Sequence, residues 1–223
     1  MRLRSFLCLA ALVLFSTAVA QAQDPVKVDS AHYKVIAENA NVRVLKISYP
    51  AGGKSVPHKH PDSIVVPLVT SNVHFANADG TSRDEELADG TAMYSPAGIH
   101  TPSNKGKGPV DAILVEFKGD APGTATLPTQ RPDMNLKMLA EGARGNAQHV
   151  VAEPTFTEPA GSKHDYDQVV IALNASGMSL SINGKPAKTT WKRGDVALIG
   201  RGEAHESKNT GGKPAEFIIV SVK

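Results

Sequence analysis

The feature that most constrains this chain is an internal repeat. Residues 90–104 read GTAMYSPAGIHTPSN, and residues 194–209 read GDVALIGRGEAHESKN. Each copy begins with Gly, runs through an apolar, strand-like segment and a Gly-containing turn, and reaches a His followed four residues later by Asn. The spacing between corresponding residues is 104 for the opening Gly and 105 for the His and the Asn. A nearly constant shift across several residue types indicates a duplication, so we expect the same structural unit to occur twice.

The repeat extends beyond these two segments. The dipeptides Asp-Gly at 79–80 and Asn-Gly at 183–184, both strong hairpin signals, lie 104 residues apart. Pro109 and Pro214, each of which precedes an apolar strand-like run, lie 105 residues apart. Helical periodicity is scarce, and 19 Gly and 15 Pro supply many turns. The pattern predicts an all-β chain in which each copy forms a small barrel of about eight short strands.

Residues 1–22 have the composition of a secretory signal peptide. Arg2 and Arg4 precede an apolar run over residues 6–15, and small-residue sequences at 18–20 and 20–22 offer cleavage sites. The apolar run is short for a membrane span, although an uncleaved anchor is the alternative. Cys8 is the only Cys and lies early in that run, which argues against a lipoprotein. We therefore expect a periplasmic or secreted protein whose mature part has neither a thiol nor a disulfide.

The mature chain is expected to be close to electroneutral. The sequence has 24 Lys and Arg against 22 Asp and Glu, and loss of Arg2 and Arg4 makes the two counts equal. The sequence has no basic stripe of the kind that binds nucleic acid, and no basic amphipathic helix. Nucleic acid is therefore not an expected partner, nor is a membrane once the signal peptide is cleaved. Any metal chemistry must use His and oxygen ligands.

The rest of the chain divides into two strand-rich units and a connecting segment. Residues 23–118 are predicted to form the first barrel, and residues 146–223 the second. Between them, residues 119–132 are rich in Gly, Pro and Thr, and residues 134–141 have the composition of a short helix. We therefore predict a linker with a short helix over residues 119–145.

The repeated motifs resemble those of the cupin superfamily. The second cupin motif is a Gly, five residues, Pro-x-Gly, two residues, His, three residues and Asn. The first copy matches it, with one residue fewer before the His, at Gly90, Pro96, Gly98, His100 and Asn104. The second copy matches it, with Gly200 in place of the Pro, at Gly194, Gly202, His205 and Asn209. The first cupin motif is represented in the first copy by Gly52, His58 and His60. The resemblance covers nearly the whole mature chain and implies two tandem cupin barrels, a jelly-roll-like double-stranded β-helix fold.

The resemblance also implies a metal site in the first barrel. In cupins the two motifs lie on neighbouring strands, so their ligand side chains converge inside the barrel. His58 and His60 are two residues apart on an extended segment and point the same way, and His100 would be the third ligand. Three neutral imidazoles can hold Fe, Mn, Zn, Ni or Cu and leave other positions open. The alternative is that these His residues are only polar lining of a barrel mouth.

The first copy departs from the family at the carboxylate ligand. The Glu position of the cupin motif falls on Ile64, and the nearby Ser63 and Asp62 are shifted from it by one and two residues. A one-residue displacement on a strand reverses the direction of the side chain. The predicted site therefore has three His and no carboxylate, which retains more positive charge and favours an anionic substrate or a bound hydroxide.

The second copy has a weaker set of ligands. The shift of 104 places Ser162 against His58, His164 against His60 and Gln168 against Ile64, and His205 corresponds to His100. We consider His164, Gln168 and His205 as a candidate second site. Two imidazoles and an amide oxygen would hold a dication loosely. An organic-ligand pocket or a vestigial barrel is the favoured interpretation, and Tyr166 and Asp167 are further candidate oxygen donors.

Two main functions follow as hypotheses, and a mainly structural oligomer joined through barrel edges is a less favoured third. The first is a metal-dependent enzyme of the dioxygenase, decarboxylase or isomerase type that acts on a small oxygen-rich molecule. The second is a non-catalytic cupin that binds a small ligand or a metal. No catalytic residue can be assigned from the sequence. A homodimer is a further expectation, and it rests on the resemblance alone.

Overall fold

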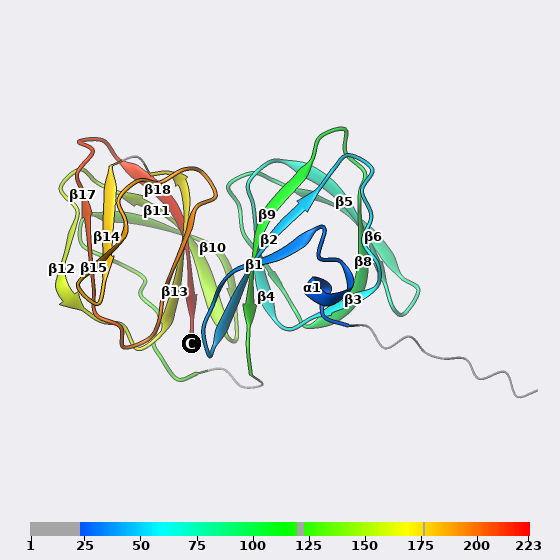
Figure 1. Cartoon of the computed structure of the whole chain (residues 1–223), viewed down its shortest axis with the longest axis horizontal. Helices are drawn as coiled ribbons and strands as arrows, with labels where there is room; N and C mark the ends of the chain where they lie inside the picture. Colours follow the sequence, from blue (N-terminus) through cyan, green and yellow to red (C-terminus); the bar gives the residue numbers. More distant parts are fainter. Residues whose placement is uncertain (1–22, 120–122, 176) are drawn as a thin grey trace, which may run out of the picture.

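The computed structural model describes residues 23–119, 123–175 and 177–223. The predicted signal peptide, residues 1–22, lies outside the described residues. The described residues form a short helix and eighteen strands arranged as two barrels side by side (Figure 1). None of their helices is long and apolar enough to cross a bilayer.

Each barrel is built from two antiparallel sheets. In the first barrel the larger sheet has the order β1-β2-β9-β4-β7, from strands Tyr33–Glu38, Val42–Tyr49, Val110–Phe117, Ser63–Pro67 and Met93–Ser95. The smaller sheet has the order β3-β8-β5-β6, from strands His58–His60, Gly98–Asn104, Ser71–Asn77 and Ser82–Leu87. The helix α1, Pro25–Val28, precedes them.

The second barrel repeats this topology strand for strand. Its larger sheet has the order β10-β11-β18-β13-β16, from strands Met134–Gly142, Gly145–Ala152, Ala215–Val222, Asp167–Asn174 and Val196–Ile199. Its smaller sheet has the order β12-β17-β14-β15, from strands Thr157–Ser162, His205–Asn209, Met178–Ile182 and Lys185–Lys188. For the described residues, the sequence prediction of an all-β fold with two tandem barrels is therefore confirmed.

Both predicted hairpins are present. β5 and β6 are joined through Gly80, which has a φ of 85°. β14 and β15 are joined through Asn183 and Gly184, with φ of 52° and 73°. Positive φ at two consecutive turn residues is the requirement of the tight hairpin turn that Asn-Gly favours.

The predicted short helix over residues 134–141 is wrong, because this segment forms strand β10. β10 pairs with β11 from Met134 opposite Ala152 to Gly142 opposite Gly145. It occupies the edge of its sheet, as β1 does in the first barrel. Pairing with a neighbouring strand overrides the modest helix preference of residues such as Met, Leu and Lys.

The repeat also contains a register change that the sequence comparison misses. Glu116 on β9 pairs with Ser63 on β4, and Ser221, its counterpart 105 residues later, pairs with Gln168 on β13. Gln168 therefore corresponds to Ser63 and not to Ile64. The shift between the two copies is 104 at His164, becomes 105 at β13 because one residue is inserted before that strand, and is 104 again at the hairpin.

The core of the described residues consists of three apolar clusters. One fills the first barrel, around Leu45, Val73 and Leu114, and one fills the second, around Val150, Leu180 and Phe217. The largest lies between the barrels, where the two five-stranded sheets pack against one another. β9 and β18 are therefore buried on both faces, which explains their nearly continuous apolar sequences.

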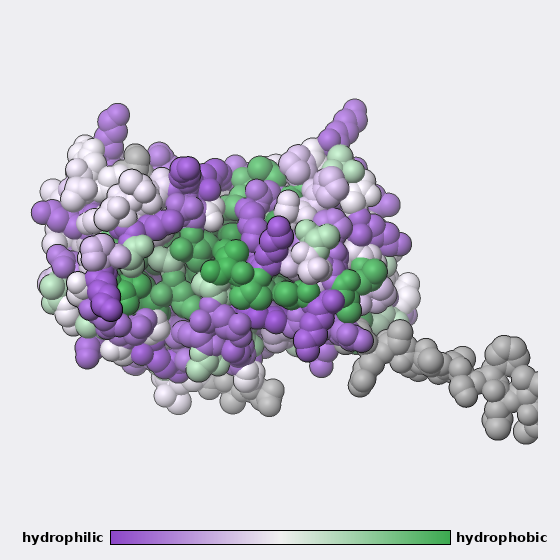
Figure 2. All heavy atoms as spheres, viewed as in Figure 1, coloured by the Kyte–Doolittle hydropathy of each residue, from purple (hydrophilic) through white to green (hydrophobic). Residues whose placement is uncertain are grey.

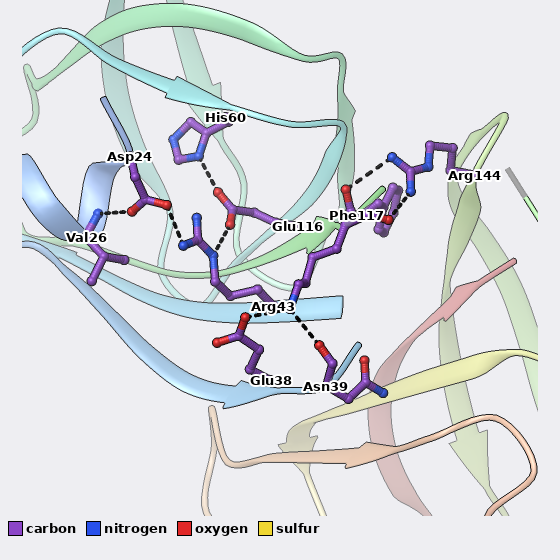
Figure 3. A network of polar contacts seen from close by, with 10 residues as sticks. Asp24, Val26, Glu38, Asn39, Arg43, His60, Glu116, Phe117 and Arg144 are labelled. Atoms are coloured by element: carbon purple, nitrogen blue, oxygen red, sulfur yellow. Dashed lines mark hydrogen bonds and ion pairs between the residues drawn. The ribbon is translucent and has the colours of Figure 1, made fainter. Parts of the chain in front are cut away.

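Polar contacts reinforce the junction between the barrels. Asp167 is fully buried, and its carboxylate accepts hydrogen bonds from Asn39, Asn41 and Arg201 at 2.7–3.0 Å. Arg144 of the second barrel donates to the carbonyl of Phe117, 3.1 Å away, and to that of Lys118 (Figure 3). On the face seen in Figure 2, apolar residues gather over the middle of the molecule, with polar residues around them. The two barrels are thus joined by the apolar cluster between them and by these polar contacts.

Candidate functional site

The three His residues of the first barrel meet on two paired strands. His58 and His60 lie on β3, and His58 is directly opposite His100 on β8. Both His58 and His60 are buried, while Lys59 between them is exposed. The ring centroids are 4.8 Å apart for His58 and His60, 5.0 Å for His58 and His100, and 5.2 Å for His60 and His100. One ligand nitrogen from each ring lies within 4.8 Å of the other two. The structure therefore brings these rings together inside the barrel.

The ring of His58 is held with one nitrogen facing the other imidazoles. Its Nδ1 lies 2.8 Å from the carbonyl oxygen of Val56, to which it can only donate. Nε2 then carries the lone pair, and the hydroxyl of Tyr33 lies 3.1 Å from it. Tyr49 donates to Tyr33 at 2.7 Å. Burial raises the pKa of Tyr33 well above its usual value, so this phenol stays protonated.

A buried carboxylate orients His60 from behind. His60 Nδ1 lies 2.7 Å from Glu116 Oε1 on β9, and Glu116 is only 1% exposed (Figure 3). The other oxygen of Glu116 accepts from Arg43, which also contacts Asp24. The arrangement fixes the tautomer with its lone pair on Nε2, as in carboxylate–histidine–metal groupings. Sequence analysis missed Glu116; its signal was a charged residue inside the apolar run ILVEF.

His58 and His100, which have no carboxylate partner, are neutral at physiological pH. Burial, together with the neighbouring His60, lowers the pKa of His58 from 6.5 to about 4. The same causes, with Arg83 and His58 adding to them, lower the pKa of His100 to about 3. A metal ion binding to these two rings would displace no proton at pH 7.

A cavity of about 130 Å³ opens next to the imidazoles. A single water needs only about 10–15 Å³ of such volume, so a small organic molecule fits. The lining is mainly apolar and includes His60 and His100. Arg83 and Glu85 of β6 also border it; they are 3.1 Å apart, and the Arg83 guanidinium lies over the ring of Phe75.

The position of the carboxylate in the cupin motif is occupied by Ile64, as the sequence indicates. Ile64 is fully buried, and its side chain packs in the apolar cluster between the barrels. Asp62 accepts a hydrogen bond from the backbone N–H of Ala97 at 2.8 Å. The carboxylate that contacts the three-imidazole cluster is therefore Glu116, through His60 Nδ1.

The second barrel brings together a different set of residues from the candidate set His164, Gln168 and His205. His164 and His205 are adjacent, with ring centroids 4.7 Å apart. The third group within 4.8 Å is Glu158 of β12. Gln168 instead accepts a hydrogen bond from Arg131 at 3.1 Å.

The other oxygen donors considered for this site have different partners. Tyr166 stacks on His164 with ring centroids 4.9 Å apart, and Asp167 belongs to the junction between the barrels. Ser162 pairs with His205 across the strands, as His58 pairs with His100, but its hydroxyl donates to the carbonyl of Pro159. Ser162, which takes the position of His58 in the second copy, is therefore not a candidate ligand.

Glu158 could not be found by comparing the two copies. Its counterpart in the first copy, 104 residues earlier, is Lys54. The strand β12 has an irregular register between Glu158 and Ser162, and Glu158 lies opposite Ser207 of β17. Burial alone would raise the pKa of Glu158, but His164 and His205 hold it well below its usual value. The carboxylate in turn raises the pKa of His205.

The comparisons with known proteins give structural matches only. No protein-family profile matches the chain, and no curated protein sequence does. The structure is similar to that of AerE from Microcystis aeruginosa, with a TM-score of 0.63 and 13% identity over 86% of this chain and 97% of that one. It is also similar to a salicylate 1,2-dioxygenase from Pseudaminobacter salicylatoxidans, with a TM-score of 0.64 and 8% identity over 86% and 76% of the two chains.

A further match is an oxalate decarboxylase from Lactobacillus farciminis. Its TM-score is 0.58, and its identity is 12% over 83% of this chain and 78% of that one. A protein described as a cupin 2 conserved barrel domain protein from Leptotrichia buccalis has the same TM-score and covers 86% of this chain. Because the identities are only 8–13%, the matches establish the cupin fold of this chain and nothing about its activity.

Proposed function

We propose that the first barrel binds a divalent metal ion through His58, His60 and His100. The observation that supports this most directly is the convergence of three imidazoles whose ligand nitrogens lie within 4.8 Å of one another. Two of the rings, His58 and His60, each donate from Nδ1 to an oxygen, so that Nε2 carries the lone pair that would bind a cation. At His58 the ion would take the place of the hydrogen bond from the Tyr33 hydroxyl, 3.1 Å from Nε2. Fe, Mn, Zn, Ni and Cu all accept such a donor set.

We further propose that the site acts on a small oxygen-rich molecule, by dioxygenase-, decarboxylase- or isomerase-type chemistry. A bound metal ion would supply a Lewis acid that polarises an oxygen of the substrate. The apolar cavity beside His60 and His100 would hold the body of the substrate and limit its contact with water. Arg83 at the cavity border would attract an anionic group. The fold shared with a salicylate dioxygenase and an oxalate decarboxylase supports this class of activity.

A non-catalytic metal- or ligand-binding role is the alternative. The carboxylates near the cavity are already engaged, Glu116 with Arg43 and His60, and Glu85 with Arg83. A paired carboxylate is a poor general base because its neighbour favours the ionised, hydrogen-bonded form. This observation favours binding without proton transfer by the protein.

Metal analysis of the purified protein tests the site. We expect metal bound at His58, His60 and His100, and loss of that ion in the His58→Ala and His100→Ala variants. His74→Ala is the matched control, since His74 lies on the neighbouring strand β5 and contacts Asp84 at the surface. A wild-type protein that takes up no metal from a mixture of Fe, Mn, Zn, Ni and Cu ions would refute the proposal.

An oxygen-electrode screen then separates enzyme from binder. The metal-loaded protein is mixed with diketones, phenols and small carboxylic acids, and both O₂ consumption and CO₂ release are recorded. Turnover that disappears in His100→Ala supports an enzyme. Saturable binding without turnover of any bound compound supports the alternative.

We also propose that residues 1–22 direct export to the periplasm or the medium. The supporting observation is the order of basic, apolar and small residues in this segment. Sequencing the N-terminus of the protein recovered from a bacterial periplasm tests it. An N-terminus at Met1 would contradict the proposal.

A further inference from the structure

We propose that the second barrel contains a second metal site, formed by Glu158, His164 and His205. The carboxylate comes from a position outside the cupin motifs, where the first barrel has Lys54. The inference does not depend on the proposed function of the first barrel, because it rests on a separate set of contacts.

The distances from Glu158 to the two imidazoles fit ligands around a shared ion. His164 Nε2 lies 3.4 Å from Glu158 Oε1, and His205 Nε2 lies 3.3 Å from Glu158 Oε2. A hydrogen bond between an imidazolium and a carboxylate is typically about 2.7–2.9 Å. Ligand atoms that each lie about 2.1 Å from one ion are separated by about 3.0–3.4 Å, depending on the geometry. The observed separations match the second case.

The orientation of His205 creates an unfavourable contact that a cation would remove. Its Nδ1 lies 3.2 Å from the carbonyl oxygen of Glu203, to which it donates. In the neutral ring, Nε2 then points a lone pair at the carboxylate of Glu158. His205 is only 2% exposed, and in the described part of the chain neither its Nε2 nor that of His164 has a hydrogen-bond partner. Unpartnered buried nitrogens facing an anion are costly unless a proton or a metal ion lies between them, and the separations of 3.4 and 3.3 Å are long for a shared proton.

The neighbouring polar groups hold Glu158 in place. Ser207 donates to Oε2 at 3.1 Å. The guanidinium of Arg131 is 3.9 Å from Oε1, too long for a hydrogen bond. One terminal nitrogen of Arg131 donates to Tyr166 at 2.7 Å and to Gln168 at 3.1 Å. Arg131 therefore contributes positive charge nearby but does not take the place of the ion between the ligands.

The donor set determines which ions the site would accept. Two imidazoles and one carboxylate suit Zn²⁺, Fe²⁺, Mn²⁺ and Co²⁺. The carboxylate makes this donor set anionic, whereas the three imidazoles of the first barrel are neutral. We expect the two barrels to differ in their preference among these ions.

Metal stoichiometry in a background without the first site tests the proposal. The His58→Ala/His100→Ala double variant is loaded with Co²⁺ or Zn²⁺, and bound metal is measured after gel filtration. We expect about one ion per chain. Adding Glu158→Gln, which keeps the side-chain length and removes the charge, should weaken Co²⁺ affinity at least tenfold and abolish the visible absorption of bound Co²⁺. Glu206→Gln is the control, because Glu206 is the exposed neighbour of His205 on β17.

The outcomes separate this site from the first one. A folded double variant that binds neither Co²⁺ nor Zn²⁺ overturns the proposal, and so does unchanged binding after Glu158→Gln. If the double variant does not fold, wild type and the single variant Glu158→Gln are compared instead. A loss of one ion per chain in the single variant supports the second site, and equal stoichiometry overturns it. If wild type and the double variant each bind one ion per chain, the first-barrel proposal is refuted and the second-site proposal is supported.

Discussion

The substitution Glu116→Gln tests how the first barrel fixes its imidazoles. Glu116 has a donor on each side: His60 Nδ1 is 2.7 Å from one carboxylate oxygen, and Arg43 Nε is close to the other. A Gln amide has only one acceptor oxygen. If this oxygen faces His60, the amide N–H₂ points at Arg43, and the guanidinium loses its acceptor. If it faces Arg43, the amide donates to His60 Nδ1 and moves the ring proton to Nε2, the nitrogen that must bind the metal.

Both outcomes weaken the site by a similar amount. Loss of a buried charge-assisted hydrogen bond is typically about 1.5–3 kcal/mol, and loss of a group that orients a metal ligand typically reduces metal affinity about 10–100-fold. These ranges agree, because a factor of ten corresponds to about 1.4 kcal/mol. We therefore expect the dissociation constant of the first-barrel metal to rise 10–100-fold in Glu116→Gln.

Competition with a chromophoric chelator measures that constant in the Glu158→Gln background, in which the second barrel does not contribute. Glu86→Gln is the matched control, since Glu86 is exposed on β6. Far-UV circular dichroism and thermal unfolding without metal confirm that the variant folds. A folded Glu116→Gln protein whose metal affinity lies within twofold of the control would refute this role for Glu116.

Three further predictions concern stability. Asp167→Ala should destabilise the protein by about 3 kcal/mol, because it leaves buried donors at the junction of the barrels without their acceptor; urea unfolding checks this, and a loss below 1 kcal/mol would contradict it. Gly184→Ala should cost about 1 kcal/mol, since its φ of 73° disfavours a side chain; the same assay with Gly108→Ala as control measures it. Without metal, stability should fall as the pH is lowered from 6.5 toward 4, because His58 and His100 take up protons in the unfolded chain before the folded one. Thermal unfolding in a chelator across this range tests that direction, and a melting temperature that rises on acidification would disprove it.

Several features follow from local sequence and were predictable. The hairpin turns at 79–80 and 183–184 depend on residues that tolerate positive φ, and this preference lies within the turn itself. His58 and His60 point to one side because alternate residues of any strand do so. The contacts of Asn104 and Asn209 are local in part: each side chain bonds to backbone groups of the adjoining loop. Each also donates to a distant carbonyl, that of Pro50 for Asn104 and those of Ala152 and Glu153 for Asn209.

Other features depend on pairing between distant segments. Residues 134–142 form a strand because β11 offers an edge to pair with, and nothing in their own composition requires it. Glu116 reaches His60, 56 residues away, only through the register of β9 and β4. Glu158 faces His205 because β12 changes register before Ser162.

The sequence by itself determined the duplication, the β class and the spacing of the His pair, because periodicity and turn preferences depend only on residues close together in the sequence. The tertiary structure decided which carboxylates approach the imidazoles. Those contacts depend on strand register and irregularity, and a shift of one residue between distant strands would turn the same side chains to the opposite face of the sheet.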